Sequence, residues 1–127
     1  MPDKMFKVIE LMKRRPGISR AEFRAYYENY HAPLCEKYCS SLSRYLRRYI
    51  DPLPHPETGP ADELPFDVIT ELWVEDEATF RSLVQYITST IMPDEVIEDE
   101  KKLFDRTSFR LATVVECESD LGALRQR

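Results

Sequence analysis

The sequence predicts an α+β domain with a ferredoxin-like plan, in which a four-stranded antiparallel sheet carries its helices on one face. Three observations predict this class. Four short stretches are rich in apolar residues, in a run or in alternation, which is typical of strands. Two stretches between them repeat apolar residues at helical spacing behind a capping residue. The resulting βαββαβ order fits within 127 residues, a length typical of one domain.

The first strand and the first helix occupy the N-terminal third of the chain. An apolar run over residues 6–13 predicts a buried strand. Ser19 and Glu22 have the spacing of a capping box, so we expect a helix from about residue 20 to 39. Pro33 falls inside this helix and lacks a backbone N–H, so a kink or a local break is expected about one turn before it.

Two further strands are expected around a proline-rich loop. Residues 42–50 alternate apolar side chains with tyrosines and arginines, and residues 66–74 form a third strand. Residues 51–65 hold five of the nine prolines, so we expect a surface loop there. The third strand divides its side chains between Phe66, Val68, Thr70, Leu72 and Val74 on one face and Asp67, Ile69, Glu71 and Trp73 on the other.

The last third of the chain predicts a helical region in two parts and a final strand. Asp76 is a capping residue for a helix through about Tyr86, and Pro93 suits the first turn of a second helix through about Phe104. An apolar stretch over residues 109–117 predicts the fourth strand.

These elements are expected to form one domain over residues 1–127. Its core covers about residues 5–118, with the surface loop at 51–65 and a charged tail at 119–127. The helices cover only one face of the sheet, and an uncovered sheet face with large apolar residues is usually an interface. We therefore expect a homodimer in which two sheets pack face to face.

Composition and charge exclude several classes of partner. The formal net charge is −5, whereas a nucleic-acid-binding protein needs clustered lysines and arginines for phosphate. Two short basic clusters, at residues 13–15 and 44–48, are expected at solvated strand ends. No apolar stretch is long enough to span a membrane, and the start of the chain has no signal-peptide pattern. We expect a cytoplasmic protein that contacts neither nucleic acid nor membrane.

The three cysteines predict free thiols. Cys35, Cys39 and Cys117 include no CxxC pair and are odd in number. Cys35 and Cys39 have a helical spacing that could suit a metal, but the chain has only two histidines, and His55 lies in the proline-rich loop. We expect no metal and no cofactor.

Several motifs, in order and at fitting distances, resemble the EthD family of dimeric α+β barrel proteins. They are the run from Lys13 to Phe23 with Tyr26-Tyr27 and His31-Ala32-Pro33, the pair Phe66-Asp67 with residues 71–74, and Asp99-Glu100 with Leu103-Phe104-Asp105. The resemblance covers about residues 5–118. It implies homodimers whose two sheets close into a barrel, with a pocket between the sheet and the helices of each subunit.

The family that the chain resembles is functionally mixed. Its relatives include polyketide cyclases, dehydratases and decarboxylases of aromatic pathways and isomerases of lactone breakdown. Related branches include cofactor-free monooxygenases, and other members accompany a cytochrome P450 system. The family histidine maps onto His31, and Tyr27 stands where an aromatic residue is common. Leu72 stands where a lactone-isomerase-like branch places a thiol, which counts against that chemistry.

His31 is the candidate catalytic residue. On the expected helix it shares a face with Tyr27, four residues earlier, and with Phe23 one turn before that. A histidine there could act as a general acid or base near neutral pH. The alternative is a structural histidine that hydrogen-bonds near the helix end at Pro33.

The candidate substrate-binding residues carry aromatic, apolar or hydroxyl side chains, and they are Tyr26, Tyr27, Tyr30, Thr70, Leu72 and Phe104. The tyrosine hydroxyls could orient an aromatic or enone substrate, or the rings belong to the core and its rim. Thr70 shares an alternating run with Leu72 and could donate a hydrogen bond into the pocket, or it is only a good strand former.

Glu10 interrupts the apolar first strand. A carboxyl buried there would have a raised pKa and could serve as an acid. The alternative, which we favour from the sequence, places Glu10 at the dimer interface, paired with an arginine such as Arg48 or Arg110.

These residues predict a cofactor-free enzyme of small-molecule metabolism that acts by proton transfer on an apolar oxygenated compound, whether aromatic, polyketide-like or lactone-like. The reaction would be a cyclisation, dehydration, isomerisation or decarboxylation, in which His31 moves the proton and a tyrosine hydroxyl stabilises the enolate. One alternative is a non-catalytic accessory or hydrophobic-ligand-binding dimer. A further alternative is a cofactor-free monooxygenase.

Overall fold

The structure is a computed structural model, and it describes residues 6–126 of the chain. Its four strands form one antiparallel sheet in the order β2-β3-β1-β4, and they are β1 (Phe6–Arg14), β2 (Arg44–Tyr49), β3 (Val68–Val74) and β4 (Phe104–Thr113). The predicted ferredoxin-like α+β fold is confirmed. Residues 1–5 and 127 of the expected domain lie outside the described residues.

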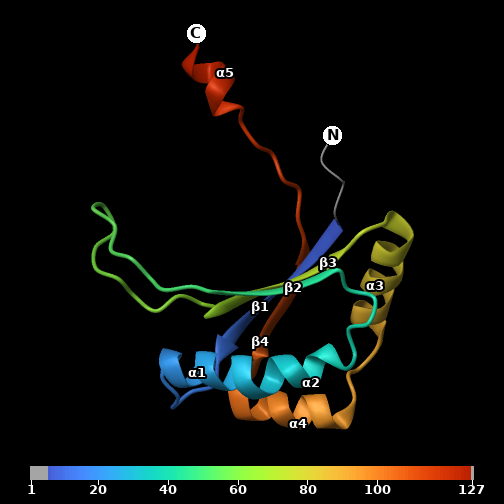
Figure 1. Cartoon of the computed structure of the whole chain (residues 1–127). Coiled ribbons are helices and arrows are strands. Elements are labelled where there is room, and N and C mark those ends of the chain that lie inside the picture. Colours follow the sequence, from blue (N-terminus) through green and yellow to red (C-terminus); the bar gives the residue numbers. More distant parts are fainter. Residues whose placement is uncertain (1–5, 127) are drawn as a thin grey trace.

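The helices gather on one side of the sheet (Figure 1). They are α1 (Arg20–Tyr26), η1 (Tyr27–His31), α2 (Ala32–Glu36), α3 (Glu77–Ser89) and α4 (Asp94–Leu103). A short helix, α5 (Leu121–Arg125), follows an extended segment after β4 and lies away from the sheet. Asp76 caps α3 as expected, since its carboxylate accepts a hydrogen bond from the backbone N–H of Thr79 at 2.7 Å.

The first helical region begins at the predicted capping box and changes its pitch in the middle. The hydroxyl of Ser19 accepts from the backbone N–H of Glu22, whose carboxylate accepts from the backbone N–H of Ser19. The chain then widens into the π-helical turn η1 before it continues as α2. Pro33 cannot donate to the carbonyl four residues before it, and a wider turn accommodates its ring. The expected local break therefore takes the form of a π turn, and the helix ends at Glu36.

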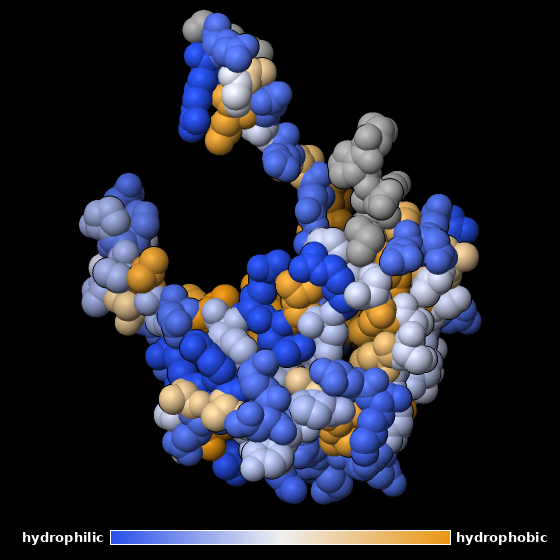
Figure 2. Space-filling model, in the orientation of Figure 1, coloured by the Kyte–Doolittle hydropathy of each residue, from blue (hydrophilic) through white to orange (hydrophobic). Residues whose placement is uncertain are grey.

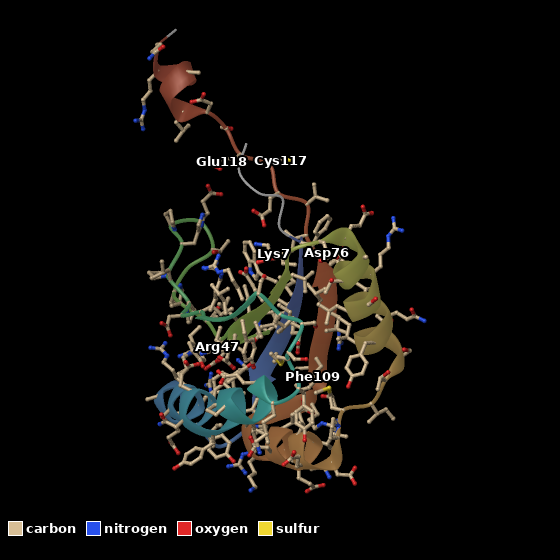
Figure 3. The ribbon with its side chains drawn as sticks, turned by 45° about the vertical axis from the view of Figure 1, so that its right-hand side comes forward. Lys7, Arg47, Asp76, Phe109, Cys117 and Glu118 are labelled. Atoms are coloured by element: carbon tan, nitrogen blue, oxygen red, sulfur yellow. The ribbon has the colours of Figure 1, made fainter. Side chains whose placement is uncertain are left out.

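The fourth strand begins earlier than predicted, directly after α4. Phe104 and Phe109 both pack in the core, with ring centroids 5.1 Å apart, although an odd spacing along a regular strand would place them on opposite faces. Phe109 lies toward the helix side of the sheet (Figure 3). A shift in the pairing of β1 with β4, between Leu11 and Lys13, reconciles the two positions. Regular alternation therefore fails over residues 104–109.

Strand register decides which side chains face the helices. Glu10, at the centre of β1, lies opposite Thr70 on β3 and Leu111 on β4. The alternate residues Val8 and Met12 are buried on the same face. The core under the helices is completed by Phe23, Tyr27, Ala32, Val68, Leu103 and Phe104.

Within the described part of the chain, no helix covers the second face of the sheet. We call this surface the open face, and its central side chains are Lys7, Ile9, Leu11, Leu46, Ile69, Glu71 and Trp73. The loop between β2 and β3 and the segment after β4 project on this side, and a hollow lies between them (Figures 1 and 2). Cys117 and Glu118 lie on the projecting segment, beyond Lys7 (Figure 3).

Each basic cluster contains side chains that are paired with carboxylates, which corrects in part the expectation that the clusters are solvated strand ends, whereas Arg15 and Arg44 are exposed. Lys13 and Arg14 both contact Glu63 of the proline-rich loop, at 2.7 and 2.9 Å, and Arg14 contacts buried Asp67 at 2.6 Å. Arg47 forms a two-pronged contact with Glu28. No described helix is long and apolar enough to cross a membrane.

Candidate functional site

A cavity of about 440 Å³ lies between the sheet and the helices. Its walls come from all the strands and from η1, α2, α3 and α4, and mostly apolar side chains line it. The polar side chains that line it include Glu10, Tyr27, His31, Cys35, Tyr45 and Glu100. The cavity is large enough for a small ring compound.

His31 is held in the wall by a carboxylate behind it. The residue is only 3% exposed, and its Nδ1 lies 2.8 Å from Oδ2 of Asp99 on α4. The other oxygen of Asp99 accepts a hydrogen bond from the hydroxyl of Tyr26 at 2.5 Å. Burial lowers the pKa of His31, while the neighbouring Asp99 raises it. The imidazole is therefore neutral at pH 7, with its proton on Nδ1 and the lone pair of Nε2 facing away from the carboxylate.

Cys35, one helical turn after His31, occupies the other side of the imidazole. Its Sγ lies 3.4 Å from Nε2 of His31. Burial raises the pKa of the Cys35 thiol to about 12, so it is protonated at neutral pH and is a weak hydrogen-bond donor rather than a nucleophile. A bound compound with a stronger hydrogen-bond donor, or with an acidic C–H, can replace the Cys35 thiol as the partner of Nε2.

Three hydroxyl groups form a chain across the cavity wall. The hydroxyl of Tyr27 lies 2.7 Å from Oγ1 of Thr70 and 3.4 Å from the hydroxyl of Tyr45. Burial raises the pKa of both tyrosines, so their hydroxyls stay protonated. Protonated hydroxyls in a largely apolar cavity are suited to hold an oxygen on which negative charge develops.

Glu10 faces this cavity, which corrects the interface position favoured from the sequence. The arginine expected to pair with it, Arg48, instead contacts Glu71 on the open face. No hydrogen bond or ion pair joins Glu10 to another side chain of the described residues. The cavity removes its carboxyl from bulk water, and this burial, with a smaller effect of Glu100, raises the pKa of Glu10 to about 7.

The candidate residues separate into four that line the cavity, one that is buried next to it and two that lie outside it. His31, Tyr27, Leu72 and Phe104 line the cavity. Thr70 is buried and meets the site through its contact with Tyr27.

Tyr26 and Tyr30 lie outside the cavity. Tyr30 is 63% exposed, and its ring packs on that of Tyr26 with centroids 5.1 Å apart. Neither lines the cavity, but Tyr26 is partly buried against the core and its hydroxyl contacts Asp99.

Sequence reasoning missed the partner of His31 and the second tyrosine of the site. Asp99 is one of several acidic residues of α4, and its local sequence does not set it apart from them. It lies on the side turned toward η1, and only the packing of two helices distant in the chain reveals it. Tyr45 belongs to a strand that alternates tyrosines with arginines, and its face follows from the register with Leu72.

The described residues include no group of three or more histidine, cysteine, aspartate or glutamate side chains placed to hold a metal ion. Burial raises the pKa of Cys39 to about 11, so this thiol is protonated like that of Cys35. The polar groups of the cavity are thus a neutral imidazole, protonated hydroxyls and thiols, and two carboxyls.

Comparison with known proteins gives the following similarities. The model of the EthD domain matches residues 15–107. An EthD family protein from Bacillus halodurans is 23% identical, with a TM-score of 0.55 over 90% of this chain and 100% of its own. An EthD-like protein from Ralstonia eutropha is 19% identical, with a TM-score of 0.52 over 91% of this chain and 96% of its own. Both support the fold. No protein of curated function matches the chain.

Proposed function

The chain belongs to the EthD domain family, and from that premise we propose that it is a cofactor-free enzyme of small-molecule metabolism. The proposed substrate is an apolar oxygenated ring compound, whether aromatic, polyketide-like or lactone-like. The proposed reaction is a proton transfer of the cyclase, dehydratase, isomerase or decarboxylase type. The observation that carries the proposal is the His31–Asp99 pair in the wall of a largely apolar cavity.

His31 is the proposed base. Asp99 holds the proton on Nδ1, so the lone pair of Nε2 is available to remove a proton from a carbon next to a substrate carbonyl. The carboxylate of Asp99 then stabilises the imidazolium. In an isomerisation Nε2 returns the proton to another carbon, and in a dehydration it gives the proton to the departing hydroxyl, which leaves as water.

The hydroxyl chain is the proposed site for the carbonyl oxygen. As the proton leaves carbon, negative charge develops on this oxygen as an enolate. Tyr45 and Tyr27 stand in the cavity with protonated hydroxyls, and Thr70 supports Tyr27 from behind. Hydrogen bonds from such fixed donors in a site of low polarity are among the largest contributions to enzyme catalysis.

Hydrogen exchange in D2O tests this proposal without knowledge of the natural substrate. The protein is incubated with 1-tetralone, 4-chromanone and dihydrocoumarin, which are uncharged bicyclic compounds with a C–H beside a carbonyl. Exchange at that carbon, followed by NMR, is expected to be faster with the protein than with buffer and to depend on His31. Saturable binding without exchange would favour the non-catalytic ligand-binding alternative. Oxygen uptake with anthrone would favour the monooxygenase alternative.

A homodimer formed through the open face is also part of the proposal. This face carries an apolar cluster of Ile9, Leu11 and Ile69 on adjacent strands, bordered by charged side chains that include Glu71 and Arg48. The two segments that project beside it carry exposed apolar side chains, with Leu53 84% and Val115 91% exposed. A second copy seated in the hollow of Figure 2 would cover both the face and these segments.

A further inference from the structure

The charges around the cavity are unbalanced. The side chains that line it include two carboxyls, Glu10 and Glu100, but among the described residues no lysine or arginine lines it. Glu100 has a partner outside the cavity, since Nε of Arg106 lies 3.4 Å from its Oε1. Glu10 has no such partner. The unpaired acidic group of the cavity is therefore at the centre of β1, on its floor.

The surroundings of Glu10 offer it no compensation from the other elements packed against the cavity. Tyr27, Tyr45, Cys35 and Cys39 all lie close enough for its charge to oppose their ionisation. These groups are protonated hydroxyls and thiols, and His31 is neutral. Among the described residues that line the cavity, none supplies a positive charge to Glu10, so a bound molecule could supply it.

We propose that Glu10 selects the ligand by charge: the cavity accepts ring compounds that are neutral with an O–H or N–H donor, or that carry a positive nitrogen, and it rejects carboxylates of the same shape. A carboxylate brought near ionised Glu10 would add a like charge in a site of low polarity. A phenol, alcohol or amide N–H could donate to Glu10, and an ammonium group could pair with it. This inference rests on the proposed function only in taking the cavity as the ligand site.

Three naphthalenes of nearly equal shape test the inference: 2-naphthylmethylamine, 2-naphthalenemethanol and 2-naphthoate. Their affinities are measured by isothermal titration calorimetry at pH 8 with the full chain. We expect the amine to bind most tightly, the alcohol next, and the carboxylate at least about tenfold more weakly than the amine. Glu10→Gln keeps the shape of the side chain and is expected to bring the three affinities to within about threefold of each other.

Glu75→Gln is the matched control, because it removes the same charge from an exposed position between β3 and α3. It is expected to leave the order of affinities unchanged. The inference is overturned if the carboxylate binds as tightly as the alcohol, if neither the amine nor the alcohol binds, or if Glu10→Gln leaves the ratio as it is. Each result is read from binding alone. A failure of His31-dependent exchange would contradict the proposed reaction and leave this selectivity standing.

Discussion

The Nδ1 atom of His31 lies 2.8 Å from Oδ2 of Asp99, although the two residues are 68 positions apart in the chain. The contact joins the π turn η1 to α4 and is made on the side of the imidazole that faces away from Cys35. A buried neutral histidine oriented by a carboxylate is a suitable general base.

Replacement of Asp99 by Asn is expected to lower the pKa of His31 further. Burial already lowers this pKa, and Asp99 is the group that opposes it, so loss of the carboxylate should lower the pKa of His31 further. The measurement is an NMR titration of the imidazole C–H signals, which are two sets because the chain has two histidines. Asp94→Asn, an exposed change on the same helix, should not move the His31 signals, and a rise of the His31 pKa in Asp99→Asn would contradict the account.

The Glu10→Gln variant is expected to stabilise the fold at high pH. The pKa of Glu10 is about 7 in the fold against 4.5 for the ordinary side chain, so the unfolded chain loses its proton first and stability falls as pH rises from 4.5 through 7. The variant should therefore gain up to about 3 kcal/mol in the free energy of unfolding at pH 8, and almost nothing at pH 4.

Urea unfolding at the two pH values measures this difference. Glu75→Gln is again the control and should show no comparable gain at pH 8. Equal effects of Glu10→Gln at pH 4 and pH 8 would mean that Glu10 is not the desolvated carboxyl described above.

The tyrosines that the sequence grouped together are expected to behave differently. Tyr45→Phe removes a hydroxyl from the cavity and should lower the exchange rate of 1-tetralone about a hundredfold, with little change in its binding. Tyr30→Phe removes a hydroxyl from a ring that lies outside the cavity and should leave the rate unchanged. A loss of rate in Tyr30→Phe equal to that in Tyr45→Phe would contradict the assignment of the hydroxyl chain.

A positive charge at the centre of the open face is expected to separate the proposed dimer. Ile69 lies between Leu11 and Arg48 on neighbouring strands, so Ile69→Lys puts a charge into the apolar cluster and a second cation beside Arg48. Analytical ultracentrifugation should then find a monomer for the variant and a dimer for the unmodified chain. Ile91→Lys, at an 83% exposed position between α3 and α4, should remain dimeric. A dimeric Ile69→Lys variant would move the interface to another surface.

The fold could be predicted from the sequence because its signals are local. The capping box at Ser19 and the alternation of β3 each depend on neighbouring residues. The start of β4 could not be predicted, because Phe104 and Phe109 reach the same face only through an irregularity in the pairing with β1. That pairing joins distant parts of the chain and leaves no local pattern.

The candidate site could be predicted in part, since the predicted residues Leu72 and Phe104 line the cavity together with two residues of the first helical region. His31 and Tyr27 share a helix face, which their spacing alone indicates. Asp99 could not be assigned to His31, since its orientation depends on how α4 packs against η1. Glu10 was assigned to the wrong face because both of its neighbours in the chain, Ile9 and Leu11, are apolar, so alternation does not show which face of the strand is buried. Only the register of Glu10 with Thr70 shows it.

The most direct test of the account is the rate of exchange of 1-tetralone in D2O with His31→Ala. If His31 is the base, its loss should reduce the protein-dependent rate at least about a hundredfold while the thermal unfolding midpoint stays close to that of the unmodified chain. His55→Ala, which changes an exposed loop histidine, should retain the full rate. A near-normal rate in His31→Ala, above all with a lowered unfolding midpoint, would show that His31 is a structural residue and would contradict the proposed mechanism.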